Sequence, residues 1–410
     1  MKIEDLKGKT AGVCVSGGLD SKTICCVLQD AGVKVKAFSA NVGQPDEKDI
    51  NDIKAKMAPT GVDTTIVDVT AEMAEICFET VKCQAMYDGG YWNSTGIARA
   101  VTVQALLPAM KAAGCTVLVH GATGRGNDQM RFERYTNVLD PQFSVYAPWR
   151  DEELLKRFPG RTQMVDFLAQ RGITAFVGTK KKYSTDANLA GLSHEAEDLE
   201  SMETSMRIVK PTMGVWPEEA PDSVEKIVLT FEKGRCTAVN GKRMTPYEVM
   251  LEANKIGGRN GVGMKHALEN RIIGTKSRGV YEAPGMEVLS WGLKYIYEAV
   301  MDRRSTLLFQ QLSKLVADQI YDGRWFDPAT RAARAAIQVW ADKATAEVTL
   351  GLYKGNIFFE SLKGPEASIY NEADSSMEAS DGLNPHSSQG FAEIQSVEAK
   401  MLAKSGQIEA

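Results

Sequence analysis

The chain has 410 residues, of which 43% are hydrophobic and 25% are charged, and its formal net charge is -5. This length predicts roughly two or three folding units, and the composition supplies enough apolar material for sizeable cores. The acidic balance excludes a basic surface for a nucleic-acid backbone, no apolar stretch reaches the ~18 residues that cross a bilayer, and residues 1–9 are too polar for a signal core. We expect a soluble, cytoplasmic protein without a nucleic-acid or membrane partner.

From residue 10 to about 177, short β-branched runs alternate with longer amphipathic runs. This alternation predicts strands and helices around a parallel sheet. Strands are expected at 10–15, 33–40, 64–67 and 116–120, and helices at 21–31, 50–57, 70–82 and 97–113. The fold class is therefore a doubly wound α/β nucleotide-binding domain, whose ligands lie outside the carboxyl ends of the strands.

Beyond about residue 178 the alternation of strand-like and helix-like runs becomes irregular. Strand-like runs at 227–231 and 346–353 stand beside a long helical run at 291–301. This mixture predicts a second, α+β domain, and we place the boundary between residues 177 and 178.

The last part of the chain has the composition of a linker followed by a helix. Residues 371–390 are rich in Ser, Asp, Glu, Asn and Gly. After them Phe391, Ile394, Val397 and Met401 recur at helical spacing, which predicts an amphipathic helix. This helix either docks on its own subunit or packs on a neighbouring one, because the linker can reach.

The cysteines and histidines give no sign of a metal centre. The seven cysteines include no CxxC pair, and the four histidines lack the i,i+4 spacing of a zinc-binding helix. We interpret the cysteines as reduced, mostly buried thiols and expect no metal site made of protein ligands alone.

The first predicted strand runs into the sequence SGGLDS at residues 16–21. Backbone N–H groups and the positive end of a helix dipole converge on such a turn. Gly17 and Gly18 let the main chain approach a phosphate closely, and the hydroxyls of Ser16 and Ser21 can donate hydrogen bonds to it. The turn is a candidate anion site, although a plain Gly-Gly connection from strand to helix has the same pattern.

A P-loop does not fit this turn. It needs a glycine immediately before its Lys-[Ser/Thr] pair, whereas Lys22-Thr23 follows Ser21. SGGLDS instead resembles the N-type ATP pyrophosphatase family, whose members cut between the α- and β-phosphates and use AMP as an activating group. The resemblance implies that the anion is ATP.

A second glycine-rich turn, HGATGRGNDQMRFE, occupies residues 120–133 after the fourth predicted strand. Its glycines permit close backbone approach, its hydroxyl and amide offer neutral hydrogen bonds, and its carboxylate and arginines can hold an ammonium and a carboxylate or phosphate. The residues are Gly121, Gly124, Gly126, Thr123, Asn127, Asp128, Arg125 and Arg131. Such a mixture suits a zwitterionic amino acid, whereas a plain solvated loop would not require it.

Three further clusters mix hydroxyls with charges: YWNSTGIAR at 91–99, YSTDANLAGLSHEAEDLE at 183–200 and ENRIIGTKSRGVYEAPG at 269–285. Taken singly, residues 184–186 could cap a helix and residues 276–279 could form a basic turn. In this order and spacing, together with the two turns, they resemble the argininosuccinate synthase family along nearly the whole chain. Finer features such as NVGQPDE at 41–47 resemble its bacterial subgroup.

This resemblance implies ATP-dependent ligation of citrulline and aspartate to argininosuccinate in arginine biosynthesis. AMP and pyrophosphate would be released through a citrulline adenylate, with Mg²⁺ bound together with ATP. It also implies an ATP-pyrophosphatase nucleotide-binding domain at 1–177, a synthetase and multimerisation domain at 178–385, a terminal tail and helix at 386–410, and a homotetramer.

The family's residue roles can be transferred position by position. ATP contacts are implied for Cys14, Val15, Ser16, Gly17, Gly18, Leu19, Asp20, Ser21, Lys22, Ala40, Gly121, Ala122, Thr123 and Asp186. Citrulline contacts are implied for Tyr91, Thr95, Asn127, Arg131, Ser184, Ser193, Glu195, Glu269 and Tyr281. Aspartate contacts are implied for Thr123, Asn127 and Asp128, and the catalytic candidates are Asp20, Asp128 and Arg131.

Two positions depart from the family pattern. The first turn usually reads SGGLDTS, whereas here it reads SGGLDSKT, so that Lys22 replaces a hydroxyl. Lys22 either adds a charged contact to phosphate or points to solvent from the first helical turn. Arg125 stands where lysine is common, which keeps the charge but changes the geometry.

Other functions remain as alternatives. Among N-type pyrophosphatases, a GMP synthetase should accompany a glutaminase domain, and a tRNA-thiolating enzyme should have a catalytic cysteine pair or a basic RNA surface; the sequence shows neither. A nucleotide-binding regulatory protein that kept the fold and lost turnover is a different class, motivated by Lys22 alone.

Overall fold

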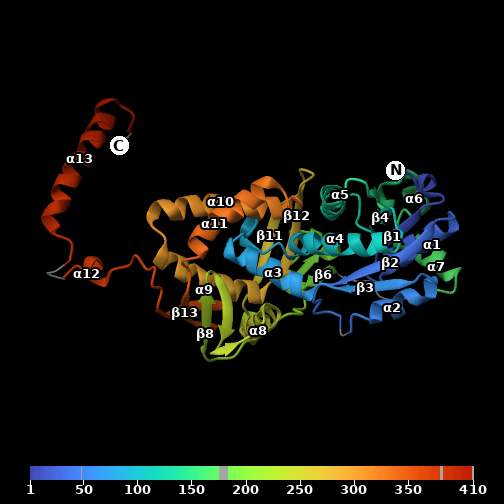
Figure 1. Cartoon of the computed structure of the whole chain (residues 1–410), viewed down its shortest axis with the longest axis horizontal. Coiled ribbons are helices and arrows are strands. Elements are labelled where there is room, and N and C mark those ends of the chain that lie inside the picture. Colours follow the sequence, from blue (N-terminus) through green and yellow to red (C-terminus); the bar gives the residue numbers. More distant parts are fainter. Residues whose placement is uncertain (48, 175–182, 379–381, 409–410) are drawn as a thin grey trace.

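The N-terminal part of the chain forms a five-stranded parallel sheet with the order β3-β2-β1-β4-β5 (Figure 1). The computed structural model describes residues 1–47, 49–174, 183–378 and 382–408. The strands are β1 Thr10–Cys14, β2 Lys34–Asn41, β3 Thr64–Asp68, β4 Val117–Val119 and β5 Ser144–Tyr146. The helices are α1 Leu19–Asp30, α2 Asp52–Met57, α3 Thr70–Lys82, α4 Ser94–Ala112, α5 Asp128–Leu139, α6 Glu152–Arg157 and α7 Arg161–Ala169.

The strand order places the functional turns together. The chain builds outward from β1 through β2 and β3, then returns to add β4 on the other side of β1. The turns that follow β1 and β4 therefore lie next to each other at the carboxyl edge, where the order of the strands reverses. This is the position at which doubly wound sheets bind ligands.

The predicted α/β fold is confirmed, with several local differences. Helices α5, α6 and α7 were not predicted, and α5 begins at Asp128, inside the predicted turn 120–133. The short strand β5 was not predicted, because three residues are too few to give a periodic signal. Helix α1 begins at Leu19 rather than at residue 21, which puts Asp20 and Ser21 into its first turn.

The C-terminal part contains two antiparallel sheets, with the orders β10-β9-β8-β13-β14 and β11-β12-β7-β6. Their strands are β6 Ser184–Asn188, β7 Gly191–Glu195, β8 Glu225–Glu232, β9 Arg235–Val239, β10 Lys242–Arg243, β11 Met264–Asn270, β12 Lys276–Glu282, β13 Ala346–Tyr353 and β14 Asn356–Lys363. The helices are α8 Pro246–Arg259, α9 Pro284–Val300, α10 Arg303–Tyr321 and α11 Pro328–Ala341. The predicted second α+β domain is confirmed.

Two local interpretations of this part are wrong. Residues 184–186 do not cap a helix, because they lie in β6 and pair with β7. Residues 276–279 are not a basic turn, since they lie in β12 and pair with β11. In both places the pairing with a neighbouring strand outweighs the local turn preference.

The two parts share a hydrophobic core. Met73 and Cys77 of α3, a helix of the N-terminal part, are buried in one cluster with Leu293 of α9 and Val348 of β13, and α3 packs on α8 and α9 (Figure 1). The predicted boundary between residues 177 and 178 lies outside the described residues.

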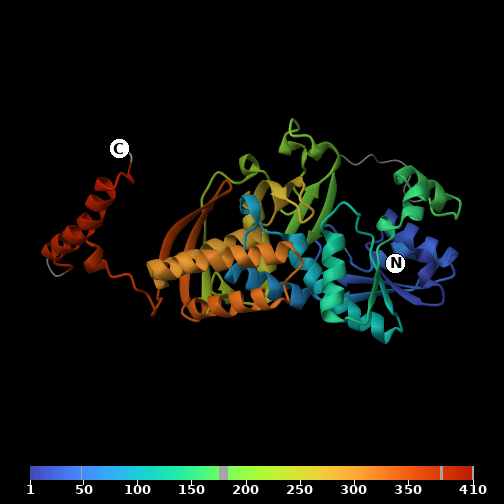
Figure 2. The ribbon, with the colours of Figure 1, turned by 90° about the horizontal axis from the view of Figure 1, so that it is seen from above.

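The tail holds two helices, α12 Glu372–Ser375 and α13 Pro385–Lys404, so part of the predicted linker 371–390 is helical. Both views show α13 standing away from the body (Figures 1 and 2). Its predicted apolar stripe, Phe391, Ile394, Val397 and Met401, is 60% to 70% exposed. Docking of this helix on its own subunit is therefore wrong.

Among the residues that the structure describes, no helix is both long enough and apolar enough to cross a membrane.

Candidate functional site

The turn between β1 and α1 is preformed. The Ser16 backbone N–H donates to Ser21 Oγ at 3.0 Å. Gly17 has φ +77°, and a Cβ there would lie 2.9 Å from Lys56 Cβ, so the turn requires glycine for both conformation and space. Gly18 begins α1 without a side-chain cap. The first N–H groups of the helix are therefore available to an anion.

Lys22 lies inside this turn rather than in solvent. Its exposed fraction is 3%, so the interpretation that it points to solvent is wrong. Burial, followed by the charge of Lys56, lowers the pKa of Lys22. Lys56 Nζ is paired with the Glu47 carboxylate at 2.7 Å, and a phosphate bound at this turn would add negative charge near both lysines.

A central cavity of about 540 Å³ opens beside the turn that follows β4. Its lining residues come from that turn and the first residues of α5, from the start of α4 and the segment before it, from the end of α10, and from β6, β7, β11 and β12 with the residues that follow them. They are Tyr91, Asn93, Thr95, Gly121, Ala122, Thr123, Arg125, Gly126, Asn127, Asp128, Arg131, Ser184, Ser193, Glu195, Ala196, Glu200, Glu269, Arg271, Tyr281 and Tyr321. Every residue that the sequence assigned to citrulline or aspartate lines this cavity.

The residues assigned to ATP fall into two groups. Gly121, Ala122 and Thr123 line the central cavity. The others, except Asp186, lie at the ends of β1 and β2 and in the first turn of α1, outside that lining; they are Cys14, Val15, Ser16, Gly17, Gly18, Leu19, Asp20, Ser21, Lys22 and Ala40. The two groups adjoin, because a Cβ on Gly121 would lie 3.6 Å from Asp20 Cβ.

One half-buried arginine holds two carboxylates at the edge of the cavity. Arg99 of α4 donates from Nε to Asp128 Oδ2 at 2.9 Å, and its Nη2 is paired with Asp186 of β6. Arg131 Nη1 lies 2.9 Å from Asp128 Oδ1. Burial raises the pKa of Asp128, but the two guanidinium groups outweigh it and hold that pKa below its usual value. For Asp186 burial dominates, and its pKa is raised.

The carboxylate of Glu269 on β11 accepts hydrogen bonds from three tyrosines. The hydroxyls of Tyr281 and Tyr321 donate to Oε2 and Oε1 at 3.1 and 3.0 Å, and that of Tyr91 also donates to Oε2. Tyr91 and Tyr281 stack with ring centroids 3.9 Å apart. Asn127 Nδ2 donates to the Tyr321 hydroxyl at 2.7 Å. These contacts give the cavity a rigid aromatic wall with a fixed acceptor behind it.

Glu195 ends β7 inside the cavity. Burial raises the pKa of its carboxyl group to about 7. Three nearby carboxylates add to the rise and one arginine opposes it; these are Asp128, Asp186, Glu269 and Arg271. Glu195 can therefore change its charge near neutral pH. Only its anionic form would attract an ammonium group.

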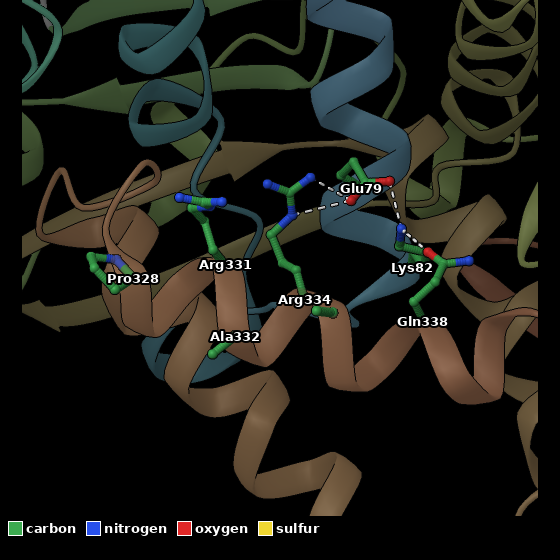
Figure 3. Close-up of a pocket in the computed structure, with 8 residues that line it drawn as sticks. Glu79, Lys82, Pro328, Arg331, Ala332, Arg334 and Gln338 are labelled. Carbon is green, nitrogen blue, oxygen red and sulfur yellow. Dashed lines mark hydrogen bonds and ion pairs between the residues drawn. The ribbon is translucent and has the colours of Figure 1, made fainter.

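A second cavity, of about 610 Å³, lies between α3 and α11 (Figure 3). Figure 3 shows that Glu79 is shared: its Oε1 pairs with Lys82 Nζ at 2.6 Å, and its Oε2 with Arg334 Nη2 at 2.6 Å. Lys82 also donates to Gln338 Oε1 at 2.6 Å. Because the carboxylate is saturated by its own neighbours, we interpret this cluster as a junction between the two parts of the chain.

Sequence reasoning missed several residues of the site. Arg99 had a signal, since it stands one helical turn after Thr95 inside the cluster 91–99. No pattern in the sequence pointed to Tyr321, because it lies at the end of α10, far along the chain from the other site residues, and only the tertiary structure brings it to the cavity. Asn93, Ala196, Glu200 and Arg271 also line the cavity without an assigned role.

Residues 11–174 match the family model of the arginosuccinate synthase N-terminal HUP domain, and residues 183–402 match that of the arginosuccinate synthase C-terminal domain. An argininosuccinate synthase of Rhodopirellula baltica is 37% identical over 399 residues, which cover 97% of this chain and 98% of that protein.

Proposed function

Since this chain belongs to the argininosuccinate synthase family and is a ligase of arginine biosynthesis, we propose that it joins citrulline to aspartate in the central cavity. The observation that supports this placement most directly is the lining itself. Residues assigned to both amino acids from separate parts of the sequence lie around one cavity of about 540 Å³, a volume within the range of small-molecule sites.

ATP would lie at the switch point of the parallel sheet. The open N–H groups of α1, the close approach permitted by Gly17 and the buried ammonium of Lys22 favour phosphates in the first turn. Gly121 lies beside Asp20, so an ATP molecule that reaches from this turn to the central cavity would pass along it. The α-phosphate would therefore face the amino acids, while the β- and γ-phosphates stay with the turn.

The two amino acids would share the cavity through Asn127 and Asp128. Citrulline would lie against Tyr91 and Tyr281, with Glu195 facing its ammonium group. Aspartate would lie at the turn after β4, where Asp128 is an anion held by two arginines. Asn127 can serve both ligands, because an amide group has separate donor and acceptor atoms.

The reaction would proceed in two displacements. The ureido oxygen of citrulline attacks the α-phosphorus, the bond to the β-phosphate oxygen breaks, and pyrophosphate leaves a citrulline adenylate. The amine of aspartate, having lost its proton, then attacks the activated carbon, and the carbon–oxygen bond to AMP breaks. The residues would contribute chiefly by positioning and by stabilising charge in a buried site.

Magnesium would enter together with ATP. Among the described residues, no group of three or more His, Cys, Asp or Glu side chains could hold a metal ion. The Asp20 carboxylate and the Ser16 and Ser21 hydroxyls near the turn suit an ion that keeps phosphate oxygens and waters as its other ligands. Its chemistry there would be to neutralise charge on the leaving pyrophosphate.

The terminal helix would serve assembly. The apolar stripe of α13 is exposed in the single chain, and an exposed apolar helix face is favourable when it packs on another protein surface. We propose that α13 packs on a neighbouring subunit of a homotetramer.

The adenylate mechanism is tested by measuring pyrophosphate release with ATP and Mg²⁺, adding citrulline and aspartate separately and then together. With citrulline alone we expect at most one equivalent per site, and sustained release only when aspartate is present. Release that requires aspartate even in the first turnover would contradict a separate adenylation step.

The location of ATP is tested by Gly17→Ala. Both Gly17 and Gly32 have positive φ, +77° and +74°, but only Gly17 has a neighbour within 4 Å of an added Cβ. We expect Gly17→Ala to raise the KM for ATP at least tenfold and the matched Gly32→Ala to leave it unchanged. Equal effects of the two substitutions would place ATP elsewhere.

A further inference from the structure

Arg271 follows β11 in the turn that joins β11 to β12, and it lines the central cavity. The turn is closed by the Arg271 backbone N–H, which donates to the Thr275 carbonyl at 2.8 Å. The next N–H, that of Ile272, donates to Asn127 Oδ1 at 3.1 Å. The backbone at Arg271 is therefore fixed beside the glycine-rich turn that follows β4.

The guanidinium group of Arg271 lies on the cavity face of the sheet. Its Nη2 donates to Ser277 Oγ at 2.8 Å, and Ser277 pairs directly with Glu269. Residues that oppose each other on neighbouring antiparallel strands point to the same face, and Glu269 lines the cavity. Ser277 therefore marks the cavity face, and the other end of the guanidinium group, Nη1, donates to the Arg125 carbonyl at 3.3 Å.

Glu195 points to the same face of this sheet. It pairs with Gly279 of β12, two positions beyond Ser277, so the side chains of Glu195 and Ser277 are diagonal neighbours. Burial raises the pKa of Glu195, and the positive charge of Arg271 opposes that rise. A cation and an anion thus lie side by side on one wall of the cavity.

The charges around the cavity leave Arg271 open to a substrate. Three arginines line it, namely Arg125, Arg131 and Arg271. Arg131 is paired with Asp128 at 2.9 Å, whereas within the described part of the chain neither Arg125 nor Arg271 has an ion pair. Arg125 is exposed and Arg271 is half-buried. Citrulline brings one carboxylate and aspartate brings two, and a carboxylate that loses water in a cavity needs a cation.

The α-carbon of an amino acid carries an ammonium and a carboxylate group together, which matches the neighbouring charges of Glu195 and Arg271. Glu195 faces the citrulline ammonium in the function proposed above, on which this inference rests. We infer that Arg271 binds the α-carboxylate of citrulline. A guanidinium group has more N–H donors than Ser277 and the Arg125 carbonyl use, so donors remain for the carboxylate oxygens.

Replacement of Arg271 by Gln removes the charge but keeps an amide donor for Ser277 or for the Arg125 carbonyl. We expect the KM for citrulline to rise about 10- to 100-fold, the factor for losing a hydrogen bond to a charged group. The KM values for aspartate and ATP should stay within about twofold, because neither is expected to contact Arg271. Arg271→Lys keeps the charge without the planar fork and should recover part of the loss.

Lys276→Gln is the matched control. It removes a positive charge from the same hairpin, where Lys276 Nζ donates to Asn270 Oδ1 at 2.7 Å on the exposed side. All three KM values should be unchanged in this variant. A rise in the KM for citrulline as large as that of Arg271→Gln would show that any charge on the hairpin has this effect, and would overturn the assignment to Arg271.

Citrullinamide, in which the α-carboxylate is a neutral carboxamide, separates binding from a purely structural role. The wild type should have a KM for citrullinamide about 10- to 100-fold above its KM for citrulline. In Arg271→Gln the two KM values should lie within about threefold of each other, because the charged contact is absent with either substrate. If the substitution instead raises both KM values by the same factor, Arg271 only supports the fold and the inference is wrong.

The remaining outcomes are also decisive. A rise in the KM for aspartate instead of citrulline would overturn the inference. So would unchanged KM values in Arg271→Gln, and in a wild-type chain that makes argininosuccinate this result would not affect the proposed function. A wild-type chain that makes none would overturn both. Thermal unfolding checks each variant, and if Arg271→Gln does not fold, the comparison of citrulline with citrullinamide is made in Arg271→Lys, where the ratio of KM values should fall below that of the wild type.

Discussion

Arg99 Nε lies 2.9 Å from Asp128 Oδ2, although the two residues belong to different helices and are 29 positions apart. The same guanidinium group pairs with Asp186 of β6. Arg99 thereby connects an expected aspartate contact to an expected ATP contact. Because Asp128 is already held as an anion, it can receive an ammonium group without first losing a proton.

Replacement of Asp128 by Asn should weaken the second half-reaction selectively. The amide keeps the shape of the side chain, so Arg99 and Arg131 remain near it, but the charge that would hold the aspartate ammonium is lost. We expect single-turnover adenylation to change less than about threefold and the aspartate-dependent step to slow about 10- to 100-fold. Asp318→Asn, which removes a surface partner of Lys314, is the control. Equal loss of both steps would count against the assignment of Asp128.

Replacement of Lys22 by Thr should weaken ATP binding alone. The substitution removes a buried ammonium group at the phosphate turn and restores the hydroxyl usual in the family. We expect the KM for ATP to rise about tenfold, as for loss of one charged contact, and the KM values of both amino acids to stay constant. Lys54→Thr on exposed α2 is the control. A lowered melting temperature with unchanged KM for ATP would show that Lys22 has only a structural role.

Citrulline binding should depend on pH through Glu195. With its pKa raised to about 7, this carboxyl group is anionic above pH 7 and becomes neutral as the pH falls. We expect the KM for citrulline to rise below pH 7, by up to about tenfold per pH unit. Glu195→Gln should have a high KM that no longer varies between pH 6 and 8. If the KM for citrulline of Glu195→Gln still rises below pH 7 as it does in the wild type, a group other than Glu195 causes this rise.

The junction formed by Glu79 should stabilise the fold at neutral pH. Burial raises the pKa of Glu79, but Lys82 and Arg334 outweigh it and hold that pKa below its usual value. A lowered pKa in the folded state contributes stability above the unfolded pKa of about 4.3. This stability is lost as the pH falls through the folded value.

We therefore expect Glu79→Gln to lower the free energy of unfolding by about 1–3 kcal/mol at pH 7, and by less at pH 3.5. Urea denaturation at pH 7 and at pH 3.5 measures the two changes in the free energy of unfolding. Glu75→Gln, which removes an exposed partner of Arg235, should change stability by less than about 1 kcal/mol. An equal loss for Glu79→Gln at both pH values would show that packing, rather than charge, is responsible.

Removal of residues 384–410 should reduce the assembly to a smaller species in sedimentation, if α13 packs on a neighbouring subunit. Val397→Asp in the full chain should act in the same direction, because it puts a charge into the apolar stripe. Glu393→Gln on the same helix is the control. An unchanged sedimentation coefficient for both the truncated chain and Val397→Asp would remove the proposed role of α13 in assembly.

The sequence by itself determined the features that depend on neighbours along the chain. The alternation of apolar runs predicted the doubly wound sheet, since parallel strands need both faces covered and crossover helices between them. The two glycine-rich turns were visible because phosphate and amino-acid ligands require close backbone approach together with particular polar groups in a short stretch. The grouping of Tyr91, Asn127 and Glu269 was also anticipated, although through family resemblance.

Only the tertiary structure decided the features that depend on distant partners. Whether Lys22 is solvated depends on what packs over the first turn of α1, and the pairing of residues 184–186 with β7 outweighed their local tendency to cap a helix. Tyr321 reaches Glu269 across 52 positions of the chain, and Arg271 reaches the turn after β4 across 146 positions. Local propensity acts over a few residues, whereas burial and pairing are properties of the assembled fold.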